Sequence, residues 1–205
     1  MAKIKLTKGE LKKQRDALKQ FQRYLPTLQL KKQQLQLEIL QQNTALLDLK
    51  QVRIKKRQAV NSWAGLLVEP QVDIKLFLVP EQIITHLKNI AGVDIPIFER
   101  LEFSEKDYDL FLMPLWLDAA IGALREIIVL NQEIAVRQEG VQILRQELRI
   151  TTQRVNLFEK VKIPLAQENI RLIKIYIGDQ MANAVGRSKI AKRKIEELIL
   201  EGAPA

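Results

Sequence analysis

The sequence predicts a mainly α-helical protein, built as a long antiparallel two-helix left-handed coiled coil with a short insert that contains a β-hairpin. Two observations predict the helices: two long blocks are poor in proline, and both repeat apolar residues every seven positions. A third predicts the insert, because four of the 7 prolines fall between residues 65 and 114. Sandwiches, barrels and doubly wound sheets are disfavoured, since they need turn residues about every ten positions.

The N-terminal block, residues 1–65, is predicted to form the first helix. One column of its repeat supplies the seam residues Leu11, Leu18, Leu25, Ile39 and Leu46. The companion column, three positions later, includes Phe21, Leu28, Leu35 and Leu49. The next column is wholly polar, and a seam that keeps its phase through the whole block is a coiled-coil signature. Gly65 can close this helix.

Residues 66–115 form the insert between the two helical blocks. A turn signal at residues 91–94 separates two β-prone runs, so a β-hairpin is predicted over about residues 82–103. Leu76–Val79 fits either a further short strand or a covered loop.

The C-terminal block, residues 116–205, is predicted to form the second helix, with Pro114 before its start. Its seam residues are Ile134, Val141, Leu148 and Val155. The same spacing continues both seam columns to Lys162, Leu165, Asn169, Leu172 and Tyr176. A seven-residue repeat implies a left-handed supercoil, and a single chain reversal makes the pair antiparallel. Because the second block is the longer one, residues 178–200 are expected to project as a nearly single helix.

Two prolines, Pro26 and Pro164, interrupt the predicted helices. A proline removes a backbone hydrogen bond and costs about 3 kcal/mol inside an isolated helix. Mild kinks are therefore expected at both positions.

Charge is unevenly placed along the chain, whose formal net charge is +9. Residues 1–57 hold 15 Lys and Arg against 4 Asp and Glu, whereas residues 66–118 hold 4 against 10. Residues 119–205 hold 14 against 10. The acidic middle is therefore expected to meet different partners from the basic flanks.

No constellation for catalysis, cofactor binding or metal binding is predicted. The chain has no cysteine, which excludes disulfides and thiolate sites and fits a reducing compartment. The single histidine, His86, falls in a predicted strand, where a structural role is expected. The stretch GDQMANAVGRS, residues 178–188, has neither the glycine spacing nor the lysine of a phosphate loop. The acid pairs Glu196–Glu197 and Asp107–Asp109 lie on solvated stretches, whereas catalytic carboxylates need burial to shift their pKa values.

Basic clusters leave two interpretations open. They fall near Lys12, at Lys55–Arg57 and between Arg187 and Lys194. Nucleic-acid binding is one hypothesis, but only 5% of the residues are aromatic, and base stacking needs aromatics beside the charge. A solvated face or an acidic protein partner is favoured, and a basic coiled-coil scaffold for nucleic acid or an acidic protein stays the alternative function.

Membrane insertion is not predicted for this chain. The N-terminal stretch MAKIKLTKGELKK has no apolar core of the kind a signal peptide needs. No run approaches the roughly 18 apolar residues that cross a bilayer. A soluble protein that works beside a membrane remains compatible with both observations.

Four stretches together resemble the central rotor-stalk component, the D subunit, of V-type (vacuolar and archaeal-type) ATPases and ATP synthases. NIAGVDIP is similar to the family's N-I-x-G-V-x-V-P hairpin segment and supplies the candidate residues Asn89, Gly92, Val93 and Pro96. RVNLFEKVKIP, residues 154–164, is similar to the family's R-V-N-x-L-E-x-x-x-I-P stretch. RSKIAKRKI resembles its R-L-K-x-I-K segment, and LTKGELKKQRDALK resembles its opening. The likeness covers nearly the whole chain, although GDQMANAV replaces the family's Glu-Arg-Glu-rich run.

The resemblance implies a non-catalytic component that transmits torque between a hexamer of catalytic A and non-catalytic B subunits and a membrane rotor. That coupling would link ATP synthesis or hydrolysis to proton or sodium transport. The tip of the second helix would sit in the hexamer through the residues Arg187, Lys189, Lys192, Arg193, Ile195, Leu198 and Ile199.

The resemblance also implies where the other partners lie. The insert would point towards the membrane. The implied partners there are the F subunit of the central stalk and the d (or C) subunit above the proteolipid ring. The complex would be peripheral, on the cytoplasmic side of the membrane. No cofactor, nucleic acid or membrane span of this chain itself is implied.

Overall fold

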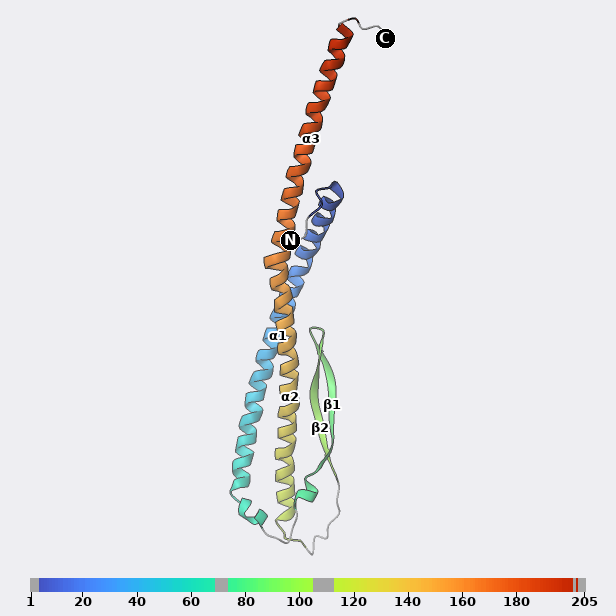
Figure 1. The fold of residues 1–205 in the computed structure, drawn as a ribbon. Helices are drawn as coiled ribbons and strands as arrows, with labels where there is room; N and C mark the ends of the chain where they lie inside the picture. Colours follow the sequence, from blue (N-terminus) through green and yellow to red (C-terminus); the bar gives the residue numbers. More distant parts are fainter. Residues whose placement is uncertain (1–3, 69–73, 105–112, 201, 203–205) are drawn as a thin grey trace. The chain divides into compact units, whose positions relative to one another are not determined.

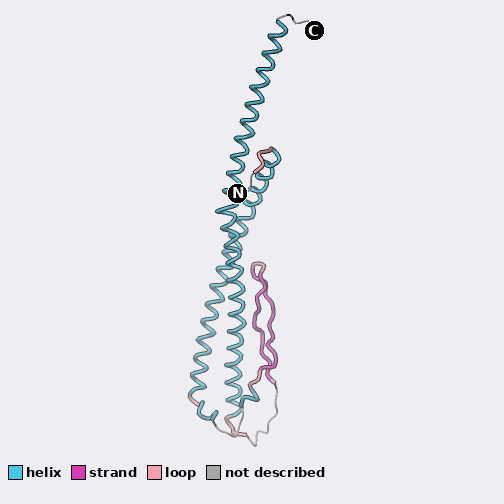
Figure 2. Tube along the Cα trace, in the orientation of Figure 1, coloured by secondary structure: helices cyan, strands magenta, loops and turns pink. Residues whose placement is uncertain are grey.

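A computed structural model describes residues 4–68, 74–104, 113–200 and 202 of the chain. It is mainly helical, with an N-terminal helix, a long C-terminal helix and a two-stranded antiparallel hairpin between them (Figures 1 and 2). The predicted fold class is therefore confirmed.

Helix α1 spans Lys8–Asn61, and 3₁₀ turns follow at Ala64–Val68 and Ile74–Phe77. Strands β1 (Pro80–Ile90) and β2 (Val93–Phe103) form the hairpin. Helix α2 (Leu117–Leu157) leads through a π-helical turn, Phe158–Lys162, into helix α3 (Ile163–Leu200).

The start of α1 follows from local side-chain chemistry. Thr7 precedes the helix, and its hydroxyl oxygen accepts a hydrogen bond from the backbone N–H of Glu10 at 3.2 Å. A threonine followed three residues later by glutamate is the sequence pattern of a helix start. The threonine therefore satisfies one of the backbone donors that the first turn of a helix leaves without an intrahelical partner.

The chain divides into two compact units. One unit consists of Met1–Gln29 and Gln153–Ala205, and the other of Leu30–Thr152.

Within residues 30–152, α1 and α2 pack with opposite chain directions. Lys31 Nζ lies 2.8 Å from the Glu147 carboxylate, and Lys56 pairs with Glu126. The residue numbers of the partners on α2 therefore decrease as those on α1 increase, which shows that the two helices are antiparallel. Leu46 packs with Ile134 and Val141 in one buried cluster. Apolar side chains spaced at seven residues thus meet across the pair, as the repeat predicts.

A second cluster closes the loop end of the same unit. Ile74 and Phe77 from a 3₁₀ turn are buried with Leu117 and Ile121 of α2. This turn shows that the segment before β1 is not the further short strand that Leu76–Val79 left open. Ile74 and Phe77 lie three residues apart, which places both side chains on one side of a 3₁₀ turn.

The hairpin closes with a two-residue turn, Ala91 and Gly92, in which both φ angles are positive (52° and 75°). Positive φ at both central positions is the type I′ geometry, whose twist matches that of paired strands. The side chain of Asn89 braces the turn. Its amide nitrogen donates to Asp94 Oδ1 at 2.7 Å, and its oxygen accepts from the Gly92 N–H at 3.1 Å.

In the other unit, the first part of α1 packs against the chain from Gln153 onward, again with opposite directions. The Phe21 and Phe158 rings lie 5.3 Å apart between centroids, and Asn169 Nδ2 donates to Gln14 Oε1 at 3.3 Å. Asn169 is buried, so this hydrogen bond satisfies a polar group in the apolar row.

The π-helical turn shifts the register of the seam that follows it. The predicted seam residues Leu165 and Leu172 are 46% and 43% exposed, whereas Ala166 and Ile173 are 3% and 0% exposed. Lys162 and Tyr176 are likewise exposed, so the continuation of the seam was wrong at these four residues. At Asn169, which is 7% exposed, the predicted position is buried. A π turn contains one extra residue, so the buried row moves by one position to Ala166, Ile170 and Ile173, while Asn169 stays buried beside Ile170.

Pro164 supplies a reason for the turn. In an α-helix its missing N–H would leave the carbonyl of Lys160 without a partner, and its ring would press on that carbonyl. The backbone N–H of Ile163 instead bonds to the carbonyl of Phe158, five residues earlier. The wider turn just before the proline absorbs this misfit, whereas Pro26 lies inside α1 itself.

We predict that Asn89→Ala lowers the free energy of unfolding by about 1–2 kcal/mol, because it removes two hydrogen bonds that hold the type I′ turn. Urea unfolding of the full chain measures this. Lys88→Ala, a neighbouring exposed substitution, serves as the control and should leave stability within about 0.5 kcal/mol. Equal effects of the two substitutions would contradict the role of Asn89.

We also predict that deleting Lys160 in a Pro164→Ala background leaves the seam intact, because an ordinary α-helix then presents Ile163, Ala166 and Ile173 without the extra residue. Inserting one alanine after Lys160 in the same background should rotate those side chains out of the seam. Exposing these aliphatic side chains should lower the free energy of unfolding by at least about 2 kcal/mol. Circular-dichroism melting curves of both variants test this, and an equal loss of stability in both would contradict the register shift.

Candidate functional site

The hairpin lies against the helices of its unit through strand β2, which passes close to α2 at Gly140. A Cβ atom on Gly140 of α2 would lie 3.6 Å from the carbonyl oxygen of Pro96 and 3.7 Å from Ile95 Cβ. Ile95 is buried with Leu35 of α1 and Leu144 of α2. One side chain from each of three elements thus forms the core under the hairpin.

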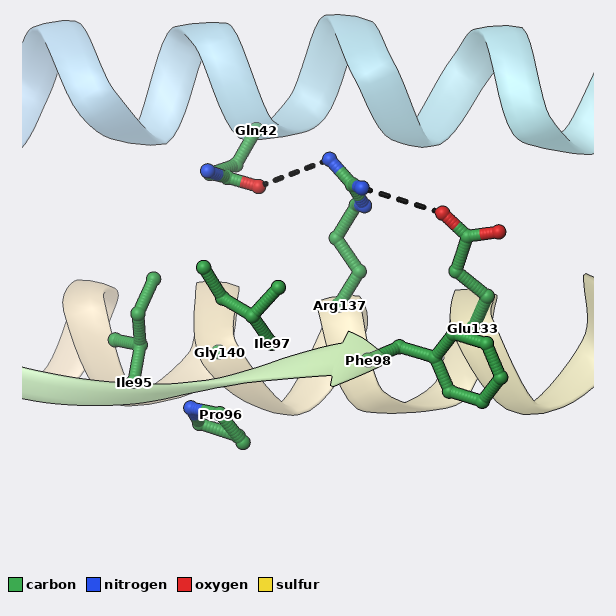
Figure 3. A pocket seen from close by; sticks show the side chains of 8 residues that line it. All are labelled: Gln42, Ile95, Pro96, Ile97, Phe98, Glu133, Arg137 and Gly140. Atoms are coloured by element: carbon green, nitrogen blue, oxygen red, sulfur yellow. Dashed lines mark hydrogen bonds and ion pairs between the residues drawn. The ribbon is translucent and has the colours of Figure 1, made fainter. Parts of the chain in front are cut away.

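A cavity of about 40 Å³ lies where β2 meets the two helices (Figure 3). Arg137 lines this cavity and donates to Gln42 Oε1 of α1 at 3.4 Å and to the Glu133 carboxylate at 3.3 Å. Both members of the Arg137–Glu133 pair are only about a quarter exposed, at 29% and 24%. A guanidinium that bridges two helices beside an apolar strand fixes their relative rotation, since its planar donors accept little change of angle.

The four candidate hairpin residues lie at or near the turn. Asn89 and Gly92 are exposed, and Val93 and Pro96 are half-buried. Asn89 and Gly92 are joined by the side-chain hydrogen bond that braces the turn. Val93 packs against the buried cluster of Leu35, Ile95 and Leu144. The motif therefore maintains the hairpin and its docking, and leaves the turn itself accessible.

The candidate tip residues all lie on α3 and are all exposed: Arg187, Lys189, Lys192, Arg193, Ile195, Leu198 and Ile199. Every residue from Gly178 to Ile199 is exposed, and Figure 1 shows this stretch in red at the end of α3. Arg193 Nε lies 3.0 Å from Glu197, and Lys192 lies 3.7 Å from Glu196, both one helical turn away. The Ile195, Leu198 and Ile199 side chains are 57–72% exposed, which leaves much apolar surface in water.

The nine seam residues are buried or half-buried. In residues 30–152, Leu46, Ile134 and Val141 form one cluster, and Ile39 and Leu148 pack on the cluster around Leu35. In the other unit, Val155 is buried and three further seam residues are half-buried: Leu11, Leu18 and Leu25.

Sequence reasoning did not single out two residues that organise the site. Gly140 lies in a helical block, and the sequence does not distinguish it from Gly122 of the same helix, where an added Cβ would meet nothing within 4 Å. Arg137 lies seven residues before Leu144, at a seam position of α2, and a charged residue at such a position is itself a signal for a bridging contact. Its partner Gln42 lies seven residues after Leu35, at a seam position of α1, and is a polar residue in an otherwise mostly apolar row.

The titratable groups give few signs of perturbed chemistry. Among the described residues no three His, Cys, Asp or Glu side chains gather where a metal ion could bind. His86 is exposed on β1. A hydrogen bond from the Arg171 guanidinium lowers the pKa of Glu168, and the same bond raises the pKa of Arg171. Asp107 and Asp109 lie outside the described residues.

The length and hydropathy of the described helices bear on membrane insertion. None of these helices contains a stretch that is both long and apolar enough to cross a membrane.

The fold and surfaces define a class of helical proteins in which two long helices pack with opposite directions and carry a docked β-hairpin. Residues 10–193 match the family of ATP synthase D subunits. The V-type ATP synthase D subunit of Borreliella burgdorferi is 44% identical over 197 residues, covering 95% of this chain and 96% of that protein. The V-type ATP synthase D subunits of Chlamydia pneumoniae and Chlamydia muridarum are 32% and 31% identical. They cover 94% and 96% of this chain, which spans 93% and 98% of their own lengths.

The chain therefore belongs to the ATP synthase D subunit family and is a component of a V-type ATPase. The resemblance drawn from the four sequence stretches is confirmed. Membership of the complex implies that other subunits contact this chain.

We predict opposite effects from two substitutions at Gly140. Gly140→Ala should raise the free energy of unfolding by up to about 1 kcal/mol, since alanine favours a helix and its Cβ makes only ordinary contacts. Gly140→Leu should lower it by at least about 2 kcal/mol, because the longer side chain displaces β2 and exposes Ile95. Urea unfolding compares the two variants, and equal changes would contradict the close approach of β2 to α2.

Proposed function

We propose that this protein is the non-catalytic central-stalk rotor of its V-type ATP synthase or ATPase. It transmits torque between the hexamer of A and B subunits and the membrane rotor, so that ATP synthesis or hydrolysis is coupled to proton or sodium transport. The observation that carries the proposal is the family match over residues 10–193, in a chain whose helices pair along rows of buried aliphatic side chains.

Paired helices suit the transmission of torque. Twisting one helix about its own axis moves its side chains out of the holes on its partner, and close packing resists that movement. Leu35 and Leu144 are fully buried within residues 30–152, and Lys31–Glu147 adds a cross-helix ion pair at 2.8 Å. In the other unit, Ile173 is equally buried. These contacts support a stiff element in each unit.

The exposed end of α3 is proposed to be the part that the A and B subunits surround. Its candidate contacts combine cationic and apolar side chains, as the residues Arg187, Lys189, Ile195 and Leu198 illustrate. Exposed ion pairs contribute only about 0–1 kcal/mol each. Weak charge contacts around apolar ones suit a surface that must form and release its contacts at each rotational step.

The hairpin is proposed to face the other partners, which are the F subunit and the d (or C) subunit that joins the stalk to the proteolipid ring. Gly92 of its turn is exposed while its inner strand is anchored on Ile95, so a partner can contact the turn without unfolding the strand. The complex would then be peripheral, on the cytoplasmic side of the membrane.

We predict that ending the chain after Gly186 abolishes ATP-driven ion pumping in reconstituted vesicles while the hairpin partners stay bound. Residues 187–199 are exposed throughout, so their removal takes no buried side chain from the seam. Pumping is followed with a pH-sensitive or sodium-sensitive dye, and retention of the other components by gel analysis of the purified complex. The matched control is Lys174→Ala, an exposed cation of α3 outside the removed segment.

The result decides the role of the helix end. Loss of pumping with all partners retained is expected in the truncated chain, and unchanged pumping in the control. Full pumping by the truncated complex would overturn the role of this end of α3 in coupling.

A further inference from the structure

Helix α1 carries a second row of aliphatic side chains, on the face directed away from its seam. The row, here called the outer stripe, repeats at the spacing of three and four residues and consists of eight positions: Leu30, Gln33, Leu37, Leu40, Thr44, Leu47, Gln51 and Ile54. Five of the eight are aliphatic, and all belong to the unit Leu30–Thr152.

The degree of exposure separates this stripe from ordinary edge residues of the seam. Its five aliphatic side chains are 50–64% exposed, whereas Leu35 and Leu46 of the seam are 0% and 6% exposed. In a two-helix coiled coil these outward positions face water and are normally polar. A sustained apolar row there marks a surface for another protein.

The spacing of the stripe fits a helix. Successive positions alternate by three and four residues, which is the pattern that two helices use to interlock their side chains. From Leu30 to Ile54 the row extends for about 36 Å at 1.5 Å per residue. A helix of about seven turns would cover it.

The charged residues of α1 beside the outer stripe indicate which side chains a covering helix would need. Near the N-terminal end of the stripe, the flanking residues of α1 include uncharged ones, as Gln34, Gln36 and Gln41 illustrate. Nearest its C-terminal end they are Lys50, Lys55 and Arg57, with Asp48 as the one carboxylate. Within the described residues, these three cations form no ion pair with a carboxylate, unlike Lys31 and Lys56 of the seam side.

A second copy of the chain would not place carboxylates opposite these three cations. Placed in parallel, two stripes would bring Lys50, Lys55 and Arg57 of one copy against the same cations of the other. Placed antiparallel, the cations would meet the neutral side chains of Gln29 and Gln34. Carboxylates opposite the three cations need a different protein.

We propose that the outer stripe of α1 is a docking surface for an amphipathic helix of a partner protein, with aliphatic residues in heptad spacing and acidic residues beside Lys50, Lys55 and Arg57. The stripe lies on neither surface that the proposed function assigns to a partner, and the inference does not depend on rotation.

A pair of synthetic helical peptides tests the proposal on the full chain. Each has four heptads with leucine at the a and d positions, and the flanking e and g positions are all glutamate in one peptide and all lysine in the other. Fluorescence anisotropy of the labelled peptides measures the dissociation constants. The acidic peptide should bind at least tenfold more tightly than the basic one.

Variants of the chain locate the binding. Leu37→Gln combined with Leu47→Gln should weaken the acidic peptide at least tenfold, and both positions are exposed, so the fold is kept. The matched control is Val52→Gln, at an exposed aliphatic residue of α1 outside the stripe. Reversing the charges at Lys50, Lys55 and Arg57 to glutamate should transfer the preference to the basic peptide.

Three results would overturn the proposal. The first is equal affinity for both peptides, and the second is an unchanged affinity in the Leu37→Gln, Leu47→Gln variant. The third comes from sedimentation of the chain alone: a dimer that this double variant dissociates would assign the stripe to a second copy.

Discussion

Burial of aliphatic side chains between helices that run in opposite directions is the constraint on which the structure depends. In residues 30–152, Leu35 and Leu144 have no exposed surface, and each such side chain contributes about 1.5–3 kcal/mol when it leaves water. Neither α1 nor α2 could be stable alone at its length, because an isolated amphipathic helix leaves this surface in water. The hairpin depends on the same cluster through Ile95, and its strand β2 passes α2 at Gly140, where an added Cβ would already be in van der Waals contact with the strand.

Polar contacts between the helices determine how far one helix can slide along the other. Arg137 holds Gln42 on the opposite helix, and Lys31 pairs with Glu147, so a slip of one helix along the other would break both contacts. Asn169 performs a similar task in the other unit through Gln14. Buried aliphatic rows tolerate sliding more readily than such contacts do, and the polar pairs therefore determine the register of the helices.

Most of the fold could be predicted because heptad spacing and turn chemistry are local signals. Ile134 and Val141 lie seven residues apart and are buried, and the turn signal at residues 91–94 marked the hairpin, whose turn is the shorter pair Ala91 and Gly92. The π-helical turn could not be predicted from spacing, since its extra residue becomes visible only when Ala166 and Ile173 replace Leu165 and Leu172 in the buried row. Leucine and isoleucine at adjacent positions make either register plausible in the sequence. The role of Gly140 depends on which strand approaches α2, which no local pattern encodes.

The candidate surfaces differ in how much the sequence could say about them. The exposed end of α3 was identified from motifs such as RSKIAKRKI, because a family resemblance transfers residue by residue. The outer stripe of α1 carries no motif of that kind, and its aliphatic residues became notable only once their exposure was known. The π-helical turn before Pro164 also affects how residues are matched between relatives. An added residue rotates a helix by about 100°, so a position beyond Lys162 that matches a relative by counting can point to a different side of the shaft. Functional residues on α3 should therefore be carried between relatives by angular phase about the helix axis, with the presence or loss of the wide turn checked first in each protein.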